Sequence, residues 1–400
     1  MNFNFLLISN IFYVLVQFLV LSLFSKFYSV ENVGEYFFAL SISAPFMIFV
    51  ALKLNNFVIT NKGDSLSFSV GEIYFIRIIF TLLGCGLSLL FFIMFFQKNT
   101  SILIVLFVII FKFTEQFDDV LAAYQSKQFN YKRFSIIKAR RASVYLLVVL
   151  ISTLLNDDFE SNLFFSGLMY FICWYFLSLK GIKPLERVKI KKMLRLFKLL
   201  FPLGLSSCIQ SLGTSGSRSF IGVKLGNSAL AIFGSISYSI TAINLVTNAL
   251  GAYFLPHFSA LKLNKHNFYK KIIFSQSVVF VLAIALLLLS HYFGEILLTI
   301  VFNEEIAEYH YGLFLLCISA SLKASTNLIG TALISIEKYS IQVWVTSLWT
   351  VCLFVFIYLM EDQKLKGMFL AVLYATIIEW LFVFFISAWH FYGHFKKTNL

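Results

Sequence analysis

The sequence predicts an all-α integral membrane protein with about twelve transmembrane helices, arranged as two six-helix bundles related by a pseudo-two-fold axis along the membrane normal. Three observations predict this fold: the composition, a series of apolar runs of membrane-spanning length, and an internal repeat. Of the 400 residues, 60% are hydrophobic and only 13% are charged. This composition lies outside the range of soluble globular domains.

The apolar runs define the expected spans, because a helical crossing needs about 20 apolar residues. The runs cover 4–24, 35–55, 74–96, 101–123, 142–155, 162–179, 199–220, 228–250, 272–291, 309–334, 339–360 and 367–391. The fifth run is the shortest. The first is too long for a signal-peptide core and lacks a basic start and a small-residue cleavage site, so we interpret it as a span.

The net charge of +13 is explained by the placement of bases in alternate loops. Inner loops of membrane proteins collect Lys and Arg, so the charge predicts no nucleic-acid partner. If the amino terminus is cytoplasmic, the inner segments hold most bases, and the outer segments hold acidic residues such as Asp157, Glu295 and Glu305. We therefore expect both termini in the cytoplasm.

The middle of the chain carries a basic run, KGIKPLERVKIKKMLRLFK at 180–198, followed by Pro202 near the start of a span. This pattern is typical of a cytoplasmic linker that leads into a second half. We expect one bundle at 1–180, a linker at 181–198 and a second bundle at 199–400. Contact with anionic membrane lipids explains the run better than a dedicated binding patch does.

The internal repeat supports the two-bundle organisation. At a shift of about 196 residues, the segment 31–37 aligns with 227–233. At a shift of about 211, the segment 122–127 aligns with 333–338, and Lys112 aligns with Lys323. A longer outer loop in the second half explains most of the growth in the shift. The matching lysines are expected if both line one cavity between the bundles.

Several charged side chains fall within the expected spans, where each costs about 2.5–3.5 kcal/mol to insert and so faces protein or water. Lys112, Lys323 and Glu379 lie near span centres, and Arg218 lies toward the outer side. Lys26 precedes the repeated segment of the first half, as Arg218 or Lys224 does in the second. We predict a cationic lumen formed by Arg218, Lys112, Lys323 and Lys26. For Lys224, snorkelling to the outer interface is the preferred interpretation.

The fourth span carries a polar stripe at helical spacing that consists of Lys112, Glu115, Gln116 and Asp119. In one interpretation, Lys112 and Glu115 neutralise each other. In the other, a carboxylate of the stripe exchanges a proton or a sodium ion during transport. Glu379 has no local base and fits either pairing across helices or ion coupling. The candidates for ion coupling are therefore Glu115, Asp119 and Glu379.

No catalytic or metal site is expected. The five cysteines all lie in apolar runs without metal-ligand spacing, and they are interpreted as small buried hydrophobic residues. The outer loops are short, which argues against an exposed catalytic head.

Three segments resemble polysaccharide exporters of the Wzx type, the O-antigen flippases, in the multidrug/oligosaccharidyl-lipid/polysaccharide superfamily. They are FSKFYS at 24–29 with ENVGEY at 31–36, LRLFKLLFPLGLSS at 194–207, and Ser217-Arg218 followed by Leu225-Gly226. The family often has an acidic residue at the position of Ser217. The resemblance extends over the whole chain through the expected topology.

The resemblance implies a transporter rather than an enzyme, located in the bacterial cytoplasmic (inner) membrane. The cargo would be an undecaprenyl-diphosphate-linked oligosaccharide, moved outward by alternating access without a cofactor and driven by a proton or sodium gradient. A polysaccharide polymerase and a chain-length regulator would be its partners. Fixed bases suit a diphosphate that crosses a hydrocarbon layer. Two alternatives stay open: an ion-coupled multidrug exporter of the same superfamily, and a membrane polysaccharide polymerase or glycosyltransferase.

Overall fold

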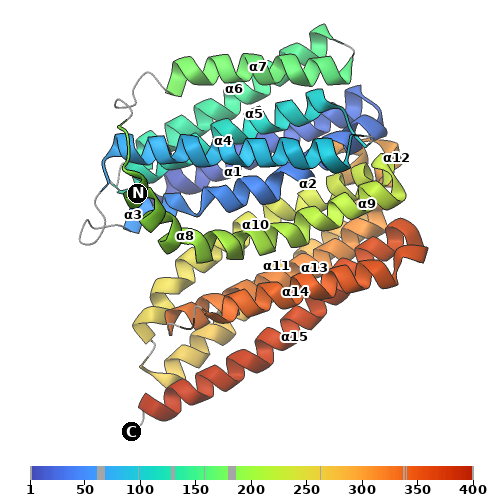
Figure 1. The fold of residues 1–400 in the computed structure, drawn as a ribbon. Coiled ribbons are helices and arrows are strands. Elements are labelled where there is room, and N and C mark those ends of the chain that lie inside the picture. The colour runs from blue at the N-terminus through green and yellow to red at the C-terminus, as the bar shows by residue number, and fades with distance from the viewer. Residues whose placement is uncertain are drawn as a thin grey trace. The chain divides into compact units, whose positions relative to one another are not determined.

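The computed structural model describes residues 2–60, 68–97, 99–127, 131–156, 158–178, 186–261, 263–336, 338 and 340–398. Within these ranges all regular elements are helical (Figure 1). The start of the predicted linker, 181–185, and Asp157 lie outside the described residues.

The described part of the chain contains twelve long helical segments, if the continuous run α8–η2–α9 is counted as one. Each overlaps one of the twelve predicted spans, so the prediction of an all-α chain with about this many long helices is confirmed. The segments are α1 (Asn2–Phe27), α2 (Val30–Ala51), α4 (Val70–Phe95), α5 (Ile102–Lys127), α6 (Tyr131–Leu155), α7 (Phe159–Ser178), α8 (Ile190–Ser211) with η2 (Leu212–Gly216) and α9 (Ser217–Leu225), α10 (Asn227–Leu261), α11 (Lys265–Val301), α13 (His310–Ser335), α14 (Ser340–Leu359) and α15 (Lys364–Thr398). Short helices are α3 (Leu54–Thr60), α12 (Glu304–Ala307) and η3 (Glu361–Gln363).

Seven helical stretches in the described residues are long and apolar enough to cross a membrane by length and composition. They are Val30–Ala51, Val70–Phe95, Ile190–Leu225, Lys265–Val301, His310–Ser335, Ser340–Leu359 and Glu361–Lys396. The helices α5 and α6 are not among them, and both carry charged side chains along their length. Large apolar side chains on α11 and α15 face outward, such as Phe280 at 66% and Phe385 at 69% exposure. Such exposure suits contact with lipid rather than water.

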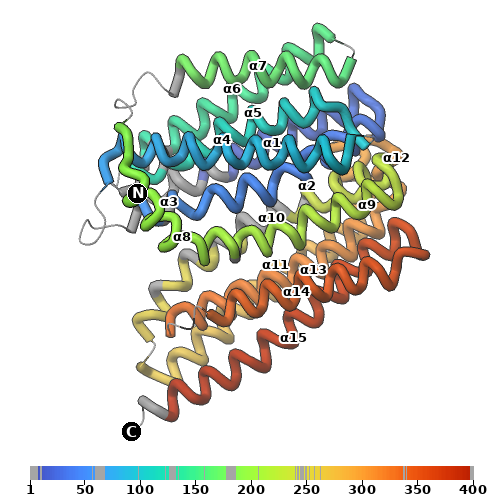
Figure 2. The backbone as a smooth tube through the Cα atoms, viewed as in Figure 1, coloured from blue at the N-terminus to red at the C-terminus, as the bar shows by residue number. Residues whose placement is uncertain are grey.

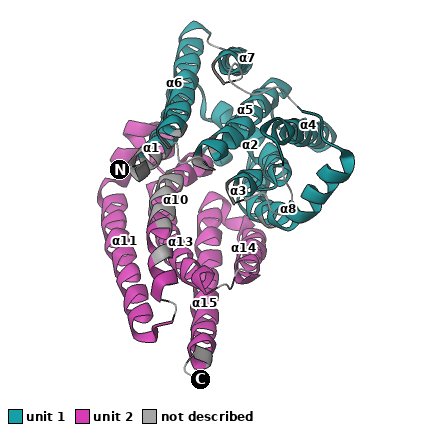
Figure 3. Ribbon diagram, turned by 90° about the vertical axis from the view of Figure 1, so that its left-hand side faces the viewer, with its two compact units in different colours: residues 1–231 teal, residues 232–400 magenta. Residues whose placement is uncertain are grey.

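The chain divides into two compact units, residues 1–231 and 232–400 (Figure 3). The first unit contains α1 to α9 and the start of α10, and the second contains the rest of α10 through α15. In the first unit the continuous run from α8 through α9 packs along α2 (Figure 2). The predicted division into bundles at 1–180 and 199–400 stays a prediction.

Local sequence signals fix several helix ends. At the start of α4, the Ser69 hydroxyl accepts a hydrogen bond from the Glu72 backbone N–H at 3.1 Å. The Glu72 carboxylate accepts one from the Ser69 backbone N–H at 2.9 Å, which completes a capping box. Lys192 of α8 donates to both Glu72 carboxylate oxygens, at 2.8 and 2.6 Å. This contact attaches the helical part of the basic run, at the start of α8, to the start of α4.

Aromatic packing dominates both cores. In the first unit Tyr74, Phe117 and Trp174 are buried together with Leu196 of α8. In the second unit the Phe268 ring lies 5.5 Å from Phe391 and 5.4 Å from Phe395, in edge-on geometry. These rings join α11 to α15, and such contacts stabilise beyond their buried area alone.

The heads of α2 and α10, which the repeat aligns, meet within the first unit. A Cβ added at Gly34 would lie 1.9 Å from the backbone oxygen of Asn227. Only glycine leaves room for this approach. The Asn227 side-chain amide also donates to the Asn99 carbonyl at 2.8 Å, which fixes the start of α10.

Candidate functional site

The first unit contains a partly buried cluster of charged side chains centred on α5. Lys112 Nζ lies 2.7 Å from Glu115 Oε2, three residues along the same helix. The other carboxylate oxygen, Oε1, accepts a hydrogen bond from the Tyr13 hydroxyl at 2.9 Å. Arg141 of α6 donates from Nη2 to the Tyr13 oxygen at 2.8 Å. Tyr13 therefore connects the Glu115 carboxylate to a second base.

Arg141 is the most heavily engaged residue of this cluster. Its Nη2 lies 3.7 Å from Glu115 Oε1, and its Nη1 lies 3.4 Å from Asp118 Oδ2. Its Nε donates to the Tyr170 hydroxyl of α7 at 3.0 Å. The guanidinium also lies 5.0 Å from the centre of the Tyr13 ring. Four helices, α1, α5, α6 and α7, therefore converge on one guanidinium.

The rest of the predicted polar stripe faces different neighbours. The Gln116 amide donates to the Met47 carbonyl of α2 at 3.3 Å. Asp118 is 5% exposed and accepts a hydrogen bond from the Trp174 indole N–H at 2.9 Å. Asp119, a coupling candidate, lies within electrostatic reach of Lys138, Arg141 and Arg77. The ion pair between Lys112 and Glu115 is present, and the coupling role of the carboxylates stays a prediction.

The second unit holds a simpler charged pair. Lys323 of α13 donates to both carboxylate oxygens of Glu379 on α15, each at 2.6 Å. The Lys323 ammonium lies 4.4 Å from the centre of the Trp349 ring of α14. The Trp349 indole N–H in turn donates to the Thr376 hydroxyl at 3.3 Å. Glu379 is only 2% exposed, so Lys323 compensates a carboxylate that water does not reach.

A hydroxyl and amide network in the second unit extends this polar region. The Ser325 hydroxyl donates to Gln276 Oε1 at 2.6 Å and accepts from the Trp380 indole N–H at 3.1 Å. Both Ser325 and Trp380 neighbour the pair in sequence, at two residues from Lys323 and one from Glu379. The network ties α11, α13 and α15 together.

Arg218 and Lys26, the other predicted lumen bases, lie in the first unit. The Arg218 guanidinium lies 5.7 Å from the centre of the Phe37 ring of α2. The next residue, Ser219, shares a hydrogen bond of 2.7 Å with Ser41 of α2. Lys26 lies in the last turn of α1 and is exposed. Arg218 lies two residues after the π-helical segment η2, a local irregularity of a kind that often marks functional positions.

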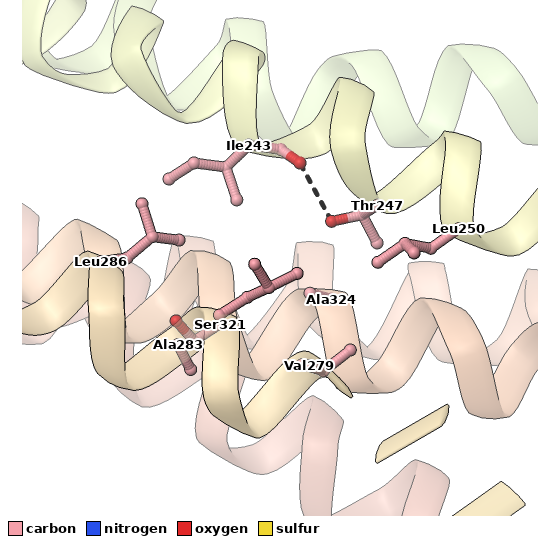
Figure 4. A pocket seen from close by; sticks show the side chains of 9 residues that line it. Ile243, Thr247, Leu250, Val279, Ala283, Leu286, Ser321 and Ala324 are labelled. Atoms are coloured by element: carbon pink, nitrogen blue, oxygen red, sulfur yellow. Dashed lines mark hydrogen bonds between the residues drawn. The ribbon is translucent and has the colours of Figure 1, made fainter. Parts of the chain in front are cut away.

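An apolar cavity of about 270 Å³ lies within the second unit, between α10, α11 and α13 (Figure 4). Its two lining hydroxyls are satisfied by their own helices: Thr247 donates to the Ile243 carbonyl at 3.0 Å, and Ser321 to the Cys317 carbonyl at 2.8 Å. The remaining lining residues are aliphatic, so the cavity suits a hydrocarbon group. None of the predicted site residues lines it.

Sequence reasoning missed Arg141, Tyr13, Tyr170 and Trp174 as members of the charged cluster. The predicted fifth span began at residue 142, which placed Arg141 in an inner loop, whereas α6 begins at Tyr131. The available signal was the spacing of Lys138, Arg141 and Tyr145 on one helical face. Arg77 of α4 was also missed; it is 2% exposed and donates to the Ala51 carbonyl at 3.2 Å.

No group of His, Cys, Asp or Glu side chains that could hold a metal ion occurs within the described ranges. The chemistry available in both units is that of bases held against carboxylates. These features define a multi-pass helical membrane protein with ion-paired bases near the middle of two of its long helices.

Comparisons with known proteins agree with this class. No protein family model matches the chain. Capsular polysaccharide biosynthesis protein CapF of Staphylococcus aureus is 28% identical over 416 residues, which cover 98% of each chain. Among solved structures, the lipid II flippase MurJ in an inward closed conformation is 14% identical, with a TM-score of 0.73 over 98% of this chain and 90% of that chain. An inward-facing multidrug resistance MATE family transporter of the MOP superfamily is 13% identical, with a TM-score of 0.66 over 100% and 96%.

The similarity to CapF confirms the predicted resemblance to proteins of surface polysaccharide biosynthesis. The solved structures confirm the fold, which this chain shares with MATE transporters and the lipid II flippase. The solved neighbours are a multidrug resistance transporter and a lipid II flippase, and the chain shares their fold over nearly its whole length. The more specific assignment to O-antigen export stays a prediction.

Proposed function

We propose that this chain is a flippase that moves a lipid-linked oligosaccharide, attached through undecaprenyl diphosphate, from the inner to the outer leaflet of the bacterial cytoplasmic membrane. Two findings support the proposal: the full-length similarity to a capsular polysaccharide biosynthesis protein, and a fold shared with a lipid II flippase. The oligosaccharide would be a repeat unit of O-antigen or a related surface polysaccharide.

The observation that carries the proposal is the presence of a mid-helix lysine in each unit, Lys112 and Lys323, each paired with a carboxylate. A diphosphate headgroup needs bases along its path, because an unpaired anion is costly in a low-dielectric medium. Each lysine side chain is 25% exposed, so neither is fully buried among its neighbours.

The residue roles follow from this observation. Arg218, Lys112, Lys323 and Lys26 contact the diphosphate as transport proceeds. Glu115, Asp119 and Glu379 are the candidates for coupling to a proton or sodium gradient. Alternating access would expose these groups to each side of the membrane in turn. A polysaccharide polymerase and a chain-length regulator would act on the exported product, and both termini would be cytoplasmic.

An ion-coupled multidrug exporter is the second candidate, because MATE family transporters share the fold. A site for cationic drugs would present unpaired carboxylates. In the described residues, Glu115 and Glu379 are instead paired with lysines. These two carboxylates are therefore not open sites for a cationic drug in this structure.

The test is a clean deletion in the native host, complemented by the wild-type gene. The expected result is loss of surface polysaccharide, together with accumulation of lipid-linked repeat units that remain accessible only from the cytoplasmic side. Normal surface polysaccharide, combined with increased sensitivity to cationic drugs, would contradict the proposal and favour the multidrug exporter.

A further inference from the structure

The ion pair formed by Lys112 and Glu115 is partly exposed on the side of Lys112 and buried on the side that faces Arg141. The Lys112 and Glu115 side chains are 25% and 20% exposed, whereas Arg141 behind them is 5% exposed. The two Glu115 oxygens are divided between these two sides. Oε2 accepts from Lys112 at 2.7 Å, and Oε1 accepts from Tyr13 at 2.9 Å with Arg141 3.7 Å away.

Arg141 is fixed in this position by contacts that do not involve Lys112. It donates to the hydroxyls of Tyr13 and Tyr170, at 2.8 and 3.0 Å, and lies 3.4 Å from Asp118. A guanidinium held by several fixed partners remains as a permanent counter-charge. The Lys112 ammonium, in contrast, sits at the end of a flexible four-carbon chain and can reorient.

We propose that Lys112 binds a phosphate-bearing ligand by exchanging its partner, Glu115, for the phosphate. Arg141 is the positioning residue that lowers the free-energy cost of this exchange. This inference rests on the proposed function and adds Arg141 as a residue on which diphosphate binding depends. When a phosphate draws Lys112 away, Glu115 keeps the Tyr13 hydroxyl and the positive field of Arg141. The carboxylate is therefore not left as an uncompensated buried charge, which would oppose the exchange.

Arg141 is only 5% exposed, yet this arrangement predicts that its loss weakens phosphate binding by Lys112. Without Arg141, Lys112 becomes the main compensating base of Glu115, so its ammonium stays on the carboxylate and binds phosphate poorly. Removing the Glu115 charge as well frees Lys112 again. A residue with only a structural role would not show this restoration, because a second substitution in the same cluster would add damage.

The experiment measures binding of farnesyl diphosphate to the purified full-length protein in nanodiscs. The Arg141→Gln/Asp118→Asn variant removes Arg141 and its other carboxylate partner together, so that no charge of Asp118 is left behind. We expect binding about tenfold weaker than wild type, equivalent to about 1.4 kcal/mol. Adding Glu115→Gln should return the affinity to within about threefold of wild type. Arg140→Gln, a neighbouring exposed base on α6, is the matched control and should leave binding within about twofold.

The outcomes separate the inference from the proposed function. Equal binding by wild type and Arg141→Gln/Asp118→Asn overturns the inference and leaves the flippase proposal intact. Failure of Glu115→Gln to restore binding, in a variant that stays monodisperse with a wild-type melting temperature, also overturns the inference alone. Absence of farnesyl diphosphate binding by the wild-type protein overturns the proposed function, and the inference with it.

Discussion

Lys112 and Lys323 occupy matching positions in the internal repeat, yet the two units compensate them differently. In the first unit the carboxylate partner, Glu115, lies three residues along the same helix. In the second unit the partner, Glu379, lies on another helix, 56 residues away in sequence. Glu115 also contacts Tyr13 and lies near Arg141. Among the described residues, Lys323 is the only base paired with Glu379.

The two units therefore keep a lysine at the matching position of the repeat, but the carboxylate that pairs with it comes from a different place in the chain. The first unit shares one carboxylate among several donors, whereas the second commits a 2% exposed carboxylate to a single lysine. Loss of the lysine should therefore lower the free energy of unfolding less in the first unit than in the second.

Lys323→Gln should lower the free energy of unfolding by about 3 kcal/mol, because it leaves the Glu379 carboxylate buried without a base. Thermal unfolding of the purified protein in detergent measures the change. The double variant Lys323→Gln/Glu379→Gln should recover most of the loss, since the buried charge is then absent. Lys270→Gln, an exposed lysine on α11, is the control. Equal destabilisation in the single and double variants would contradict the claim that Lys323 compensates the buried charge of Glu379.

Gly34→Ala should destabilise the protein by about 2 kcal/mol, and Gly312→Ala by about 1 kcal/mol. The added Cβ at Gly34 would meet the Asn227 backbone oxygen at 1.9 Å, and helix backbone cannot move aside. At Gly312 the nearest atom belongs to the Phe369 ring, at 2.5 Å, and a side chain adjusts more easily. The same unfolding measurement compares the two variants. A larger cost for Gly312→Ala would show that the contact between α2 and α10 is less rigid than described.

Lys112→Gln should cost only about 1 kcal/mol of unfolding free energy, because Tyr13 and Arg141 continue to compensate Glu115. Surface polysaccharide should nevertheless fall, since the base proposed to contact the diphosphate is lost. The two readouts are a melting temperature for the purified protein and polysaccharide on cells with matched protein levels. A destabilisation as large as that of Lys323→Gln would remove the proposed difference between the units.

Arg218→Lys should reduce export several-fold with little change in stability. A guanidinium can hold phosphate oxygens through two parallel hydrogen bonds and can stack on the Phe37 ring, whereas an ammonium acts as a point charge. By contrast, Lys323→Arg should retain much of the activity, because a base still faces Glu379. Surface polysaccharide in the complemented deletion strain measures both variants. Full export by Arg218→Lys would show that charge alone is needed there.

The sequence predicted the helices well, because apolar run length directly sets the number of crossings. It also singled out Lys112, Glu115, Lys323 and Glu379, since charges within apolar runs are conspicuous. It could not show that Lys323 pairs with Glu379, because contacts between distant helices depend on packing. Arg141 was hidden for another reason: α6 starts before its apolar part, so a base on its inner turns was interpreted as part of a loop.

The most direct test reconstitutes the purified protein in liposomes with a fluorescent undecaprenyl-diphosphate oligosaccharide, and measures how fast the headgroup becomes accessible in the opposite leaflet. We predict transfer well above that of protein-free liposomes, and strongly reduced transfer by Lys112→Gln/Arg218→Gln at equal reconstitution. No transfer by the wild-type protein, while the same liposomes transport a lipophilic cation, would contradict this prediction.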